Sequence, residues 1–162
     1  MKKLIGGAAV LAGLAILAIA ATALATPPQG VTVLPLAPVA QFGEINAKAK
    51  SGDWKAQIKT KGVSDFHVVQ VTIQPGGHLG WHSHLGPSFV IVKSGTASFY
   101  HADDPTCTRH EVLTGSSLFE PAGNEHIVRN EGTEPLVNVV VQLLPTGAPR
   151  LISEPNPGNC PF

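Results

Sequence analysis

Short apolar runs separated by turn-forming residues dominate the chain from Trp54 onward, and no long helical pattern interrupts them. Gly and Pro supply 17 and 14 of the 162 residues, well above what a helical bundle carries. A chain that must turn this often cannot build long helices, and it favours many short strands. The sequence therefore predicts an all-β domain, arranged as a sandwich or a barrel.

The expected strands follow from where the apolar runs start and stop. They cover residues 55–60, 66–73, 79–84, 89–93, 96–101, 108–113, 117–120, 126–130 and 136–143. Turn signals such as Pro75-Gly76-Gly77 and Ser94-Gly95 separate them. A short helical turn is expected at Glu44–Lys50. Strands of this length around one core indicate a jelly-roll barrel in a single domain.

The first 25 residues have the pattern of a secretory signal peptide. Lys2 and Lys3 precede an uncharged stretch rich in Ala, Leu and Ile, which ends in Ala23-Leu24-Ala25. This pattern predicts cleavage near Ala25 and export to the periplasm or the cell exterior, with no stable membrane insertion afterwards. Because the apolar stretch is longer than usual, an uncleaved membrane anchor is the competing interpretation.

Composition divides the rest of the chain into three parts. Residues 26–53 are Pro-rich and are expected to form an extended N-terminal arm, residues 54–144 hold the barrel, and residues 145–162 form a C-terminal coil. Cys107 and Cys160 are the two cysteines. In an oxidising compartment we expect them to form a disulfide that ties the coil to a loop in mid-chain.

Charge composition excludes one class of partner. The chain has 11 basic and 11 acidic residues, which give a formal net charge of +0. Binding to a phosphate backbone relies on a concentrated positive field, and this composition does not provide one. Nucleic acid is therefore not expected as a partner, and a small-molecule ligand is.

His82-Ser83-His84 is the most informative short motif. Side chains two apart on a strand point to the same face, so the two imidazoles would project together. If that face lines a barrel interior, two neutral nitrogen ligands converge, and a third from another strand would complete a metal-binding set. Imidazole suits Fe, Zn, Cu and Ni.

The spacing around this pair resembles the two sequence motifs of the cupin family. Residues 76–95 read Gly-x5-His-x-His-x3-Ser-x6-Gly, and residues 115–130 read Gly-x5-Pro-x-Gly-x2-His-x3-Asn. The resemblance covers Phe66–Leu144 and implies a cupin-type double-stranded β-helix. It also implies that one divalent metal ion is held by three histidines, His82, His84 and His126.

One motif position departs from the family pattern. Where cupins usually have a glutamate ligand, this chain has Ser88, whose short neutral hydroxyl is a poor metal ligand. The predicted ligand set therefore has no carboxylate. Glu125 adjoins His126 and should face the opposite way, and Glu120 is interpreted as a solvated charge at the barrel rim. The candidates for contact with the metal ligands or with a substrate are Ser88, His78, Glu120 and Tyr100.

The resemblance implies a function built around the metal ion, with Fe(II) favoured and Zn, Mn, Ni or Cu also compatible. The leading hypothesis is an oxygenase-like enzyme that acts on a small anionic or chelating molecule. The alternatives are a non-catalytic module that binds a metal or small molecule, and a metal-free structural barrel. Cupins commonly dimerise through an edge strand or an N-terminal arm, so a homodimer is expected.

Overall fold

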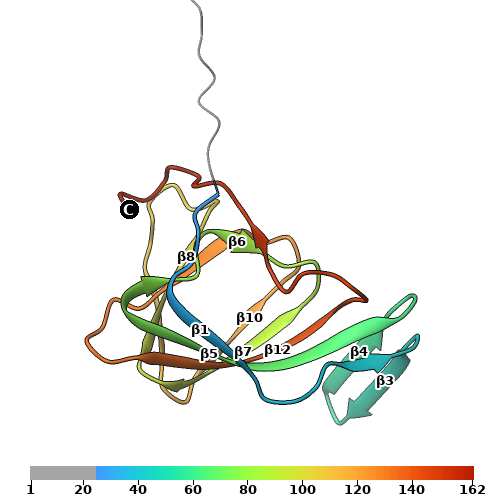
Figure 1. Ribbon diagram of the computed structural model, residues 1–162. Helices are drawn as coiled ribbons and strands as arrows, with labels where there is room; N and C mark the ends of the chain where they lie inside the picture. Colours follow the sequence, from blue (N-terminus) through green and yellow to red (C-terminus); the bar gives the residue numbers. More distant parts are fainter. Residues whose placement is uncertain (1–24) are drawn as a thin grey trace, which may run out of the picture.

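The computed structural model describes residues 25–162, which form strands joined by turns and loops (Figure 1). Residues 1–24, which make up all but the last residue of the predicted signal peptide, lie outside the described residues. Within the described part of the chain there is no helix that could span a membrane. The chain is all-β, as the turn pattern predicted, and its main sheet curls into a nearly closed barrel.

The barrel consists of one sheet of eleven strands. Its members are β1 (Gln29–Pro35), β2 (Ala40–Phe42), β5 (Ser64–His78), β6 (His82–Ser83), β7 (Ser88–Ser94), β8 (Thr96–His101), β9 (His110–Leu113), β10 (Ser117–Glu120), β11 (His126–Arg129), β12 (Leu136–Pro145) and β13 (Ile152–Ser153). The order along the main path is β10-β7-β12-β5-β11-β6-β13, all in antiparallel pairs. β1 and β2 pair with β5, and β8 pairs with β11 and β9.

Alternating burial along β12 shows how the interior is filled. Its inward positions are Leu136, Asn138, Val140, Gln142 and Leu144. Most inward residues of the neighbouring strands are apolar, and they form the main core with Val71, Val90 and Val128 among its members. Burial of such side chains is the main favourable contribution to folding. The two amides on β12 are exceptions, and both lie at the cavity described below.

The N-terminal region contributes two strands of the barrel sheet and a separate hairpin. β1 and β2 pair in register with β5, so this part of the chain belongs to the barrel sheet. The helical turn expected at Glu44–Lys50 is wrong: β3 (Asn46–Ser51) and β4 (Trp54–Lys59) form a separate hairpin beside the barrel (Figure 1). Lys and Ala favour helices, but Gly52, with φ of 58°, closes a tight turn that pairs the two segments.

The C-terminal tail is tied to the barrel at two places. The predicted disulfide between Cys107 and Cys160 is present, with a Cα–Cα distance of 5.2 Å. Cys160 packs in a second buried cluster, whose members include Trp81 and Tyr100. Within the tail, β13 pairs with β6, which was expected as a longer strand and is only two residues long. The tail therefore supports the segment that carries the histidine pair.

A glycine in the turn after this pair is expected to matter for stability. A Cβ atom added to Gly86 would overlap the backbone carbonyl oxygen of Leu143 on β12. Because a backbone cannot yield as a side chain does, we expect Gly86→Ala to lower the free energy of unfolding by about 1–3 kcal/mol. Denaturant titration would measure the change. Gly43→Ala is the control, since nothing lies within 4 Å of an added Cβ there; equal losses in both variants would contradict the expectation.

Candidate metal centre

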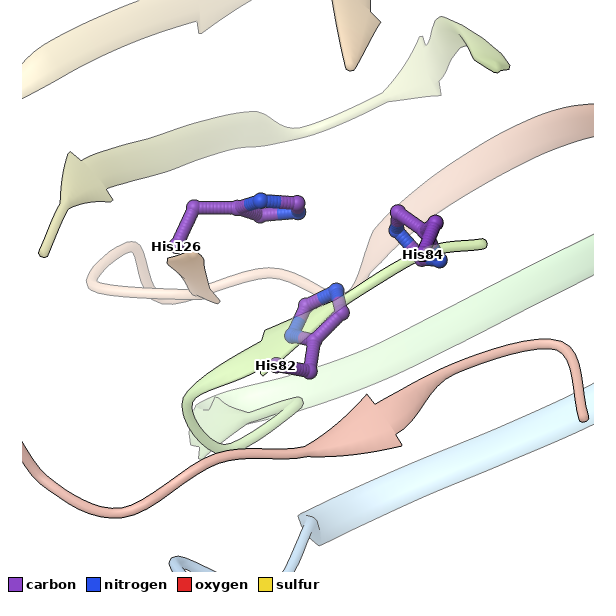
Figure 2. A group of neighbouring side chains, drawn as sticks. All are labelled: His82, His84 and His126. Atoms are coloured by element: carbon purple, nitrogen blue, oxygen red, sulfur yellow. The ribbon is translucent and has the colours of Figure 1, made fainter. Parts of the chain in front are cut away.

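The three predicted histidines meet inside the barrel (Figure 2). His82 lies on β6, His84 directly follows that strand, and His126 begins β11. The spacing of two places His82 and His84 on one face, and the pairing of His82 with His126 brings the third ring to the same face. One ligand nitrogen from each ring lies within 4.8 Å of the others, and all three side chains are buried.

A backbone carbonyl contacts each ring. The Nδ1 atoms contact the carbonyl oxygens of Gly80 (2.9 Å from His82), Arg150 (2.8 Å from His84) and Asn124 (2.9 Å from His126). A carbonyl oxygen can only accept, so Nδ1 of His82 and of His126 donates, whereas Nδ1 of His84 also lies 3.1 Å from Gln142 Nε2. In a neutral ring whose Nδ1 carries the proton, Nε2 presents a lone pair. Such outer hydrogen bonds are the usual way in which proteins orient metal-binding histidines.

Glu120 brings a carboxylate to this cluster. It ends β10, its side chain is buried (4% exposed), and its two oxygens lie 3.1 Å from His84 Nε2 and 3.3 Å from His126 Nε2. The expectation that Glu120 is a solvated rim charge is therefore wrong. The burial of Glu120 acts to raise its pKa, but the contacts with His126 and His84 outweigh it and lower the pKa to about 2.

Strand pairing explains how this carboxylate reaches the cluster. Glu120 on β10 lies directly opposite Ser88 on β7. Residues directly opposite in an antiparallel pair project from the same face. Glu120 therefore enters from one strand further along the sheet, on the face where the motif glutamate would project. Ser88 itself is fully buried, and its Oγ accepts a hydrogen bond of 2.9 Å from Gln142 Nε2.

The electrostatics of the cluster favour a cation. Burial lowers the pKa of His82 to about 3, with a further contribution from His126, so this ring stays neutral. His84 Nε2 and His126 Nε2 are buried, and the groups that face them are the Glu120 oxygens at 3.1 and 3.3 Å. A charged carboxylate facing such nitrogens requires a positive charge between them, either a proton or a metal ion. The residues present thus fit a divalent ion.

Two other predicted site residues lie elsewhere. His78 Nδ1 accepts a hydrogen bond of 3.1 Å from the backbone N–H of Gly80. Tyr100 belongs to the second buried cluster, and its hydroxyl donates to the Glu131 carboxylate at 2.9 Å. Neither residue lines the cavity at the histidines. Glu125 is exposed beside His126, as its position on the strand predicted.

A small cavity of about 40 Å³ adjoins His82, His84 and Glu120. Its apolar lining is Val33, Val71, Leu79, Val90, Leu118, Val128, Val140 and Leu151. Three polar residues at the cavity were not anticipated from the sequence, namely Asn138, Gln142 and Arg150. The alternation of β12 could have indicated the two amides, because Asn138 and Gln142 occupy the alternate positions that point into the barrel. For Arg150 there was no such signal. A small polar molecule beside the histidine cluster suits this lining.

Comparison with known proteins gives one family match. Residues 69–142 match the family model described as a cupin domain. No curated protein sequence matches the chain. Similar solved structures include a cupin superfamily protein from Desulfitobacterium hafniense, at 15% identity over 75% of this chain and 83% of that chain, with a TM-score of 0.46.

Two further solved structures cover less of the sequence. A cupin-like protein from Thermotoga maritima is 21% identical over 56% of this chain and 65% of that chain, with a TM-score of 0.49. The polyketide cyclase RemF from Streptomyces resistomycificus is 20% identical over 57% of this chain and 64% of that chain, with a TM-score of 0.47. The chain thus spans less than two thirds of the length of either protein.

Proposed function

We propose that this chain, which belongs to the cupin superfamily, binds one divalent metal ion and acts as an oxygenase-like enzyme on a small anionic molecule. The proposed ligands are His82, His84, His126 and Glu120. The observation that carries the proposal is the convergence of three lone-pair nitrogens and one carboxylate on a common, buried point.

The chemistry of the ligand set supports this proposal and favours iron. Three imidazole nitrogens and one carboxylate oxygen are a mixed N,O set of the kind that binds Fe(II), and Zn, Mn, Ni and Cu are also compatible. A bound ion of this kind supplies a Lewis acid and, when it is iron, a redox centre that can engage dioxygen. One carboxylate leaves a divalent ion with a net positive charge, which favours an anionic partner in the cavity.

The surrounding residues hold the ligands and limit access by water. The Arg150 carbonyl accepts from His84 Nδ1 at 2.8 Å and from Gln142 Nε2 at 3.0 Å. Gln142 Nε2 also donates to Ser88, so one buried amide connects the β7 strand with the segment after β12. Apolar side chains line most of the cavity, which strengthens electrostatic interactions inside it. The disulfide supports the further proposal that the protein works after export, in an oxidising compartment.

Metal analysis tests the first part of the proposal. We expect the wild-type protein to bind about one Fe(II) per chain, and His126→Ala to bind it at least about 100-fold more weakly, because one of the buried ligands is lost. Anaerobic dialysis followed by elemental analysis measures both. His110→Ala is the control, since His110 is an exposed histidine outside the cluster. Equal metal content in the two variants would contradict the assigned site.

Oxygen uptake tests the second part. The iron-loaded wild-type protein is expected to consume dioxygen with at least one member of a panel of thiols, diketones and phenolic acids, and His126→Ala is not. If the iron-loaded protein consumes no dioxygen with any of them, the oxygenase proposal fails. The chain would then be a module that binds a metal or a small molecule.

A further inference from the structure

Arg150 brings a positive charge to the cavity that adjoins His82 and His84. It lies in the segment between β12 and β13, and it lines the same cavity as His84 and Glu120. Its Nε donates to Gln142 Oε1 at 3.0 Å. Because Gln142 is 1% exposed, this bond fixes the guanidinium against the barrel interior. The side chain of Arg150 is therefore directed inward, although it is not fully buried.

The charge of Arg150 has no counter-ion within the described part of the chain. None of the ion pairs among residues 25–162 includes it, whereas Arg109 and Arg129 both pair with Glu131. Burial lowers the pKa of Arg150 somewhat, and the group remains charged at neutral pH. Holding a partly buried cation without a partner is unfavourable. Among the described residues, Nε is the one nitrogen of Arg150's guanidinium that forms a hydrogen bond, so its terminal N–H groups can bind an anion.

A second polar group in the cavity also lacks a partner. Asn138, on the inward face of β12, is 3% exposed, and its Oδ1 has no hydrogen-bond partner among the described residues. Buried polar atoms are nearly always paired, so such an atom indicates an additional molecule in the cavity. The cavity of about 40 Å³ has room for about three water molecules or a similarly small organic molecule.

We propose that the cavity binds a small carboxylate whose carboxylate group pairs with the guanidinium of Arg150. This inference rests on the proposed function in one respect: the bound molecule would lie beside the metal ion held by His84 and Glu120. A guanidinium matches a carboxylate because its N–H groups form two parallel hydrogen bonds. The anionic substrate class expected from the metal charge is thereby narrowed to small carboxylic acids.

Calorimetric titration of the full chain tests the inference. The Zn(II)-loaded and metal-free forms are titrated with acetate and L-lactate, and with the neutral amides acetamide and lactamide. We expect the wild-type protein to bind at least one of the acids more tightly than its amide. Arg150→Gln should weaken that binding by about 10- to 100-fold, as expected for loss of a charge-assisted hydrogen-bond pair. Its backbone carbonyl still accepts from His84, so Zn(II) affinity should change by less than about threefold.

Two controls separate this role from a merely structural one. Arg109→Gln removes a guanidinium that lies outside the cavity and should leave acid binding unchanged. Arg150→Lys keeps the charge and should retain part of the affinity, and it serves as the test variant if Arg150→Gln does not fold. Equal acid binding by the wild-type protein and the folded Arg150 variant would overturn the inference, as would failure of both acids to bind. Inorganic phosphate binding more tightly than both acids would also overturn it.

The same titrations distinguish this inference from the proposed function. If the protein binds no Zn(II) or Fe(II) but the metal-free form still binds acid through Arg150, the carboxylate site stands and the proposed metal function fails. If metal binds normally and the Arg150 substitution leaves acid affinity unchanged, the metal site stands and the carboxylate site fails.

Discussion

Glu120→Gln is expected to weaken metal binding by at least about 100-fold. The substitution keeps the size of the side chain but replaces a charged carboxylate, 3.1 Å from His84 Nε2 and 3.3 Å from His126 Nε2, with a neutral amide. Loss of a partner outside the ligand shell already costs 10–100-fold in metal affinity, so loss of a charged ligand should cost at least the upper end of that range. Competition titration with a fluorescent chelator measures the dissociation constant.

Metal-dependent stability gives a second measurement of the same effect. A metal concentration 100 times the dissociation constant stabilises the folded protein by about 2.7 kcal/mol. After a 100-fold loss of affinity in Glu120→Gln, the same concentration would contribute only about 0.4 kcal/mol. The metal-free variant loses the contacts with His126 and His84 that lower the pKa of Glu120, so it should be less stable than the metal-free wild-type protein at neutral pH. Denaturant unfolding with and without metal separates the two contributions.

Glu125→Gln is the matched control for this experiment. It makes the same chemical change at an exposed position next to His126, and it should leave metal affinity unchanged. If Glu120→Gln binds metal as well as Glu125→Gln does, Glu120 is not a ligand and the site is formed by the histidines alone. The double variant Ser88→Glu/Glu120→Ser moves the carboxylate back across the strand pair, and it should recover most of the lost affinity.

Removing the disulfide is expected to lower the free energy of unfolding by about 4 kcal/mol. Cys107 and Cys160 close a loop with a sequence separation of 53, which restricts the unfolded chain and so favours the folded state. Cys160 is also buried beside Trp81, one residue before the first histidine of the cluster. The double variant Cys107→Ala/Cys160→Ala should therefore unfold at much lower denaturant concentration than the wild-type protein.

Fluorescence of Trp81 reports this transition directly. The chain has two tryptophans, and Trp54→Phe removes the exposed one on the hairpin. In that background, reducing the intact disulfide with dithiothreitol should produce the same loss of stability as the double alanine variant, and the alanine variant should not respond to the reductant. A difference below about 1 kcal/mol between oxidised and reduced protein would contradict this expectation.

Most of the strands and the His82/His84 pair could be predicted because their signals are local. A spacing of two places His82 and His84 on one strand face whatever the rest of the chain does. Gly95 and Gly115 have φ of 80° and 83°, a backbone conformation that glycine adopts readily in tight turns. From β7 to β12, apolar runs bounded by such turns matched the observed strands within two residues at each end, since most of these strands have a buried face. The turn expected at Pro75-Gly76-Gly77 is wrong, because these residues lie inside β5.

The N-terminal strands could not be predicted in the same way. β1 is exposed at six of its seven positions, and β3 is exposed throughout. Hydrophobic alternation reports burial of one face, so strands with neither face well buried leave no pattern to read. β1 is a strand because it pairs with β5, and β3 is a strand because it pairs with β4. Only the folded chain shows those partners.

The sequence by itself determined an all-β chain with His82 and His84 on one strand face, because strand periodicity and turn residues act over a few positions; the resemblance to the cupin motifs added His126. Only the tertiary structure decided what completes that cluster. Glu120 reaches it through the register between β10 and β7, and Arg150 reaches the cavity through a hydrogen bond to β12. Strand register is determined by packing over the whole barrel. Residues far apart in sequence therefore become neighbours although no local sequence pattern predicts their contact.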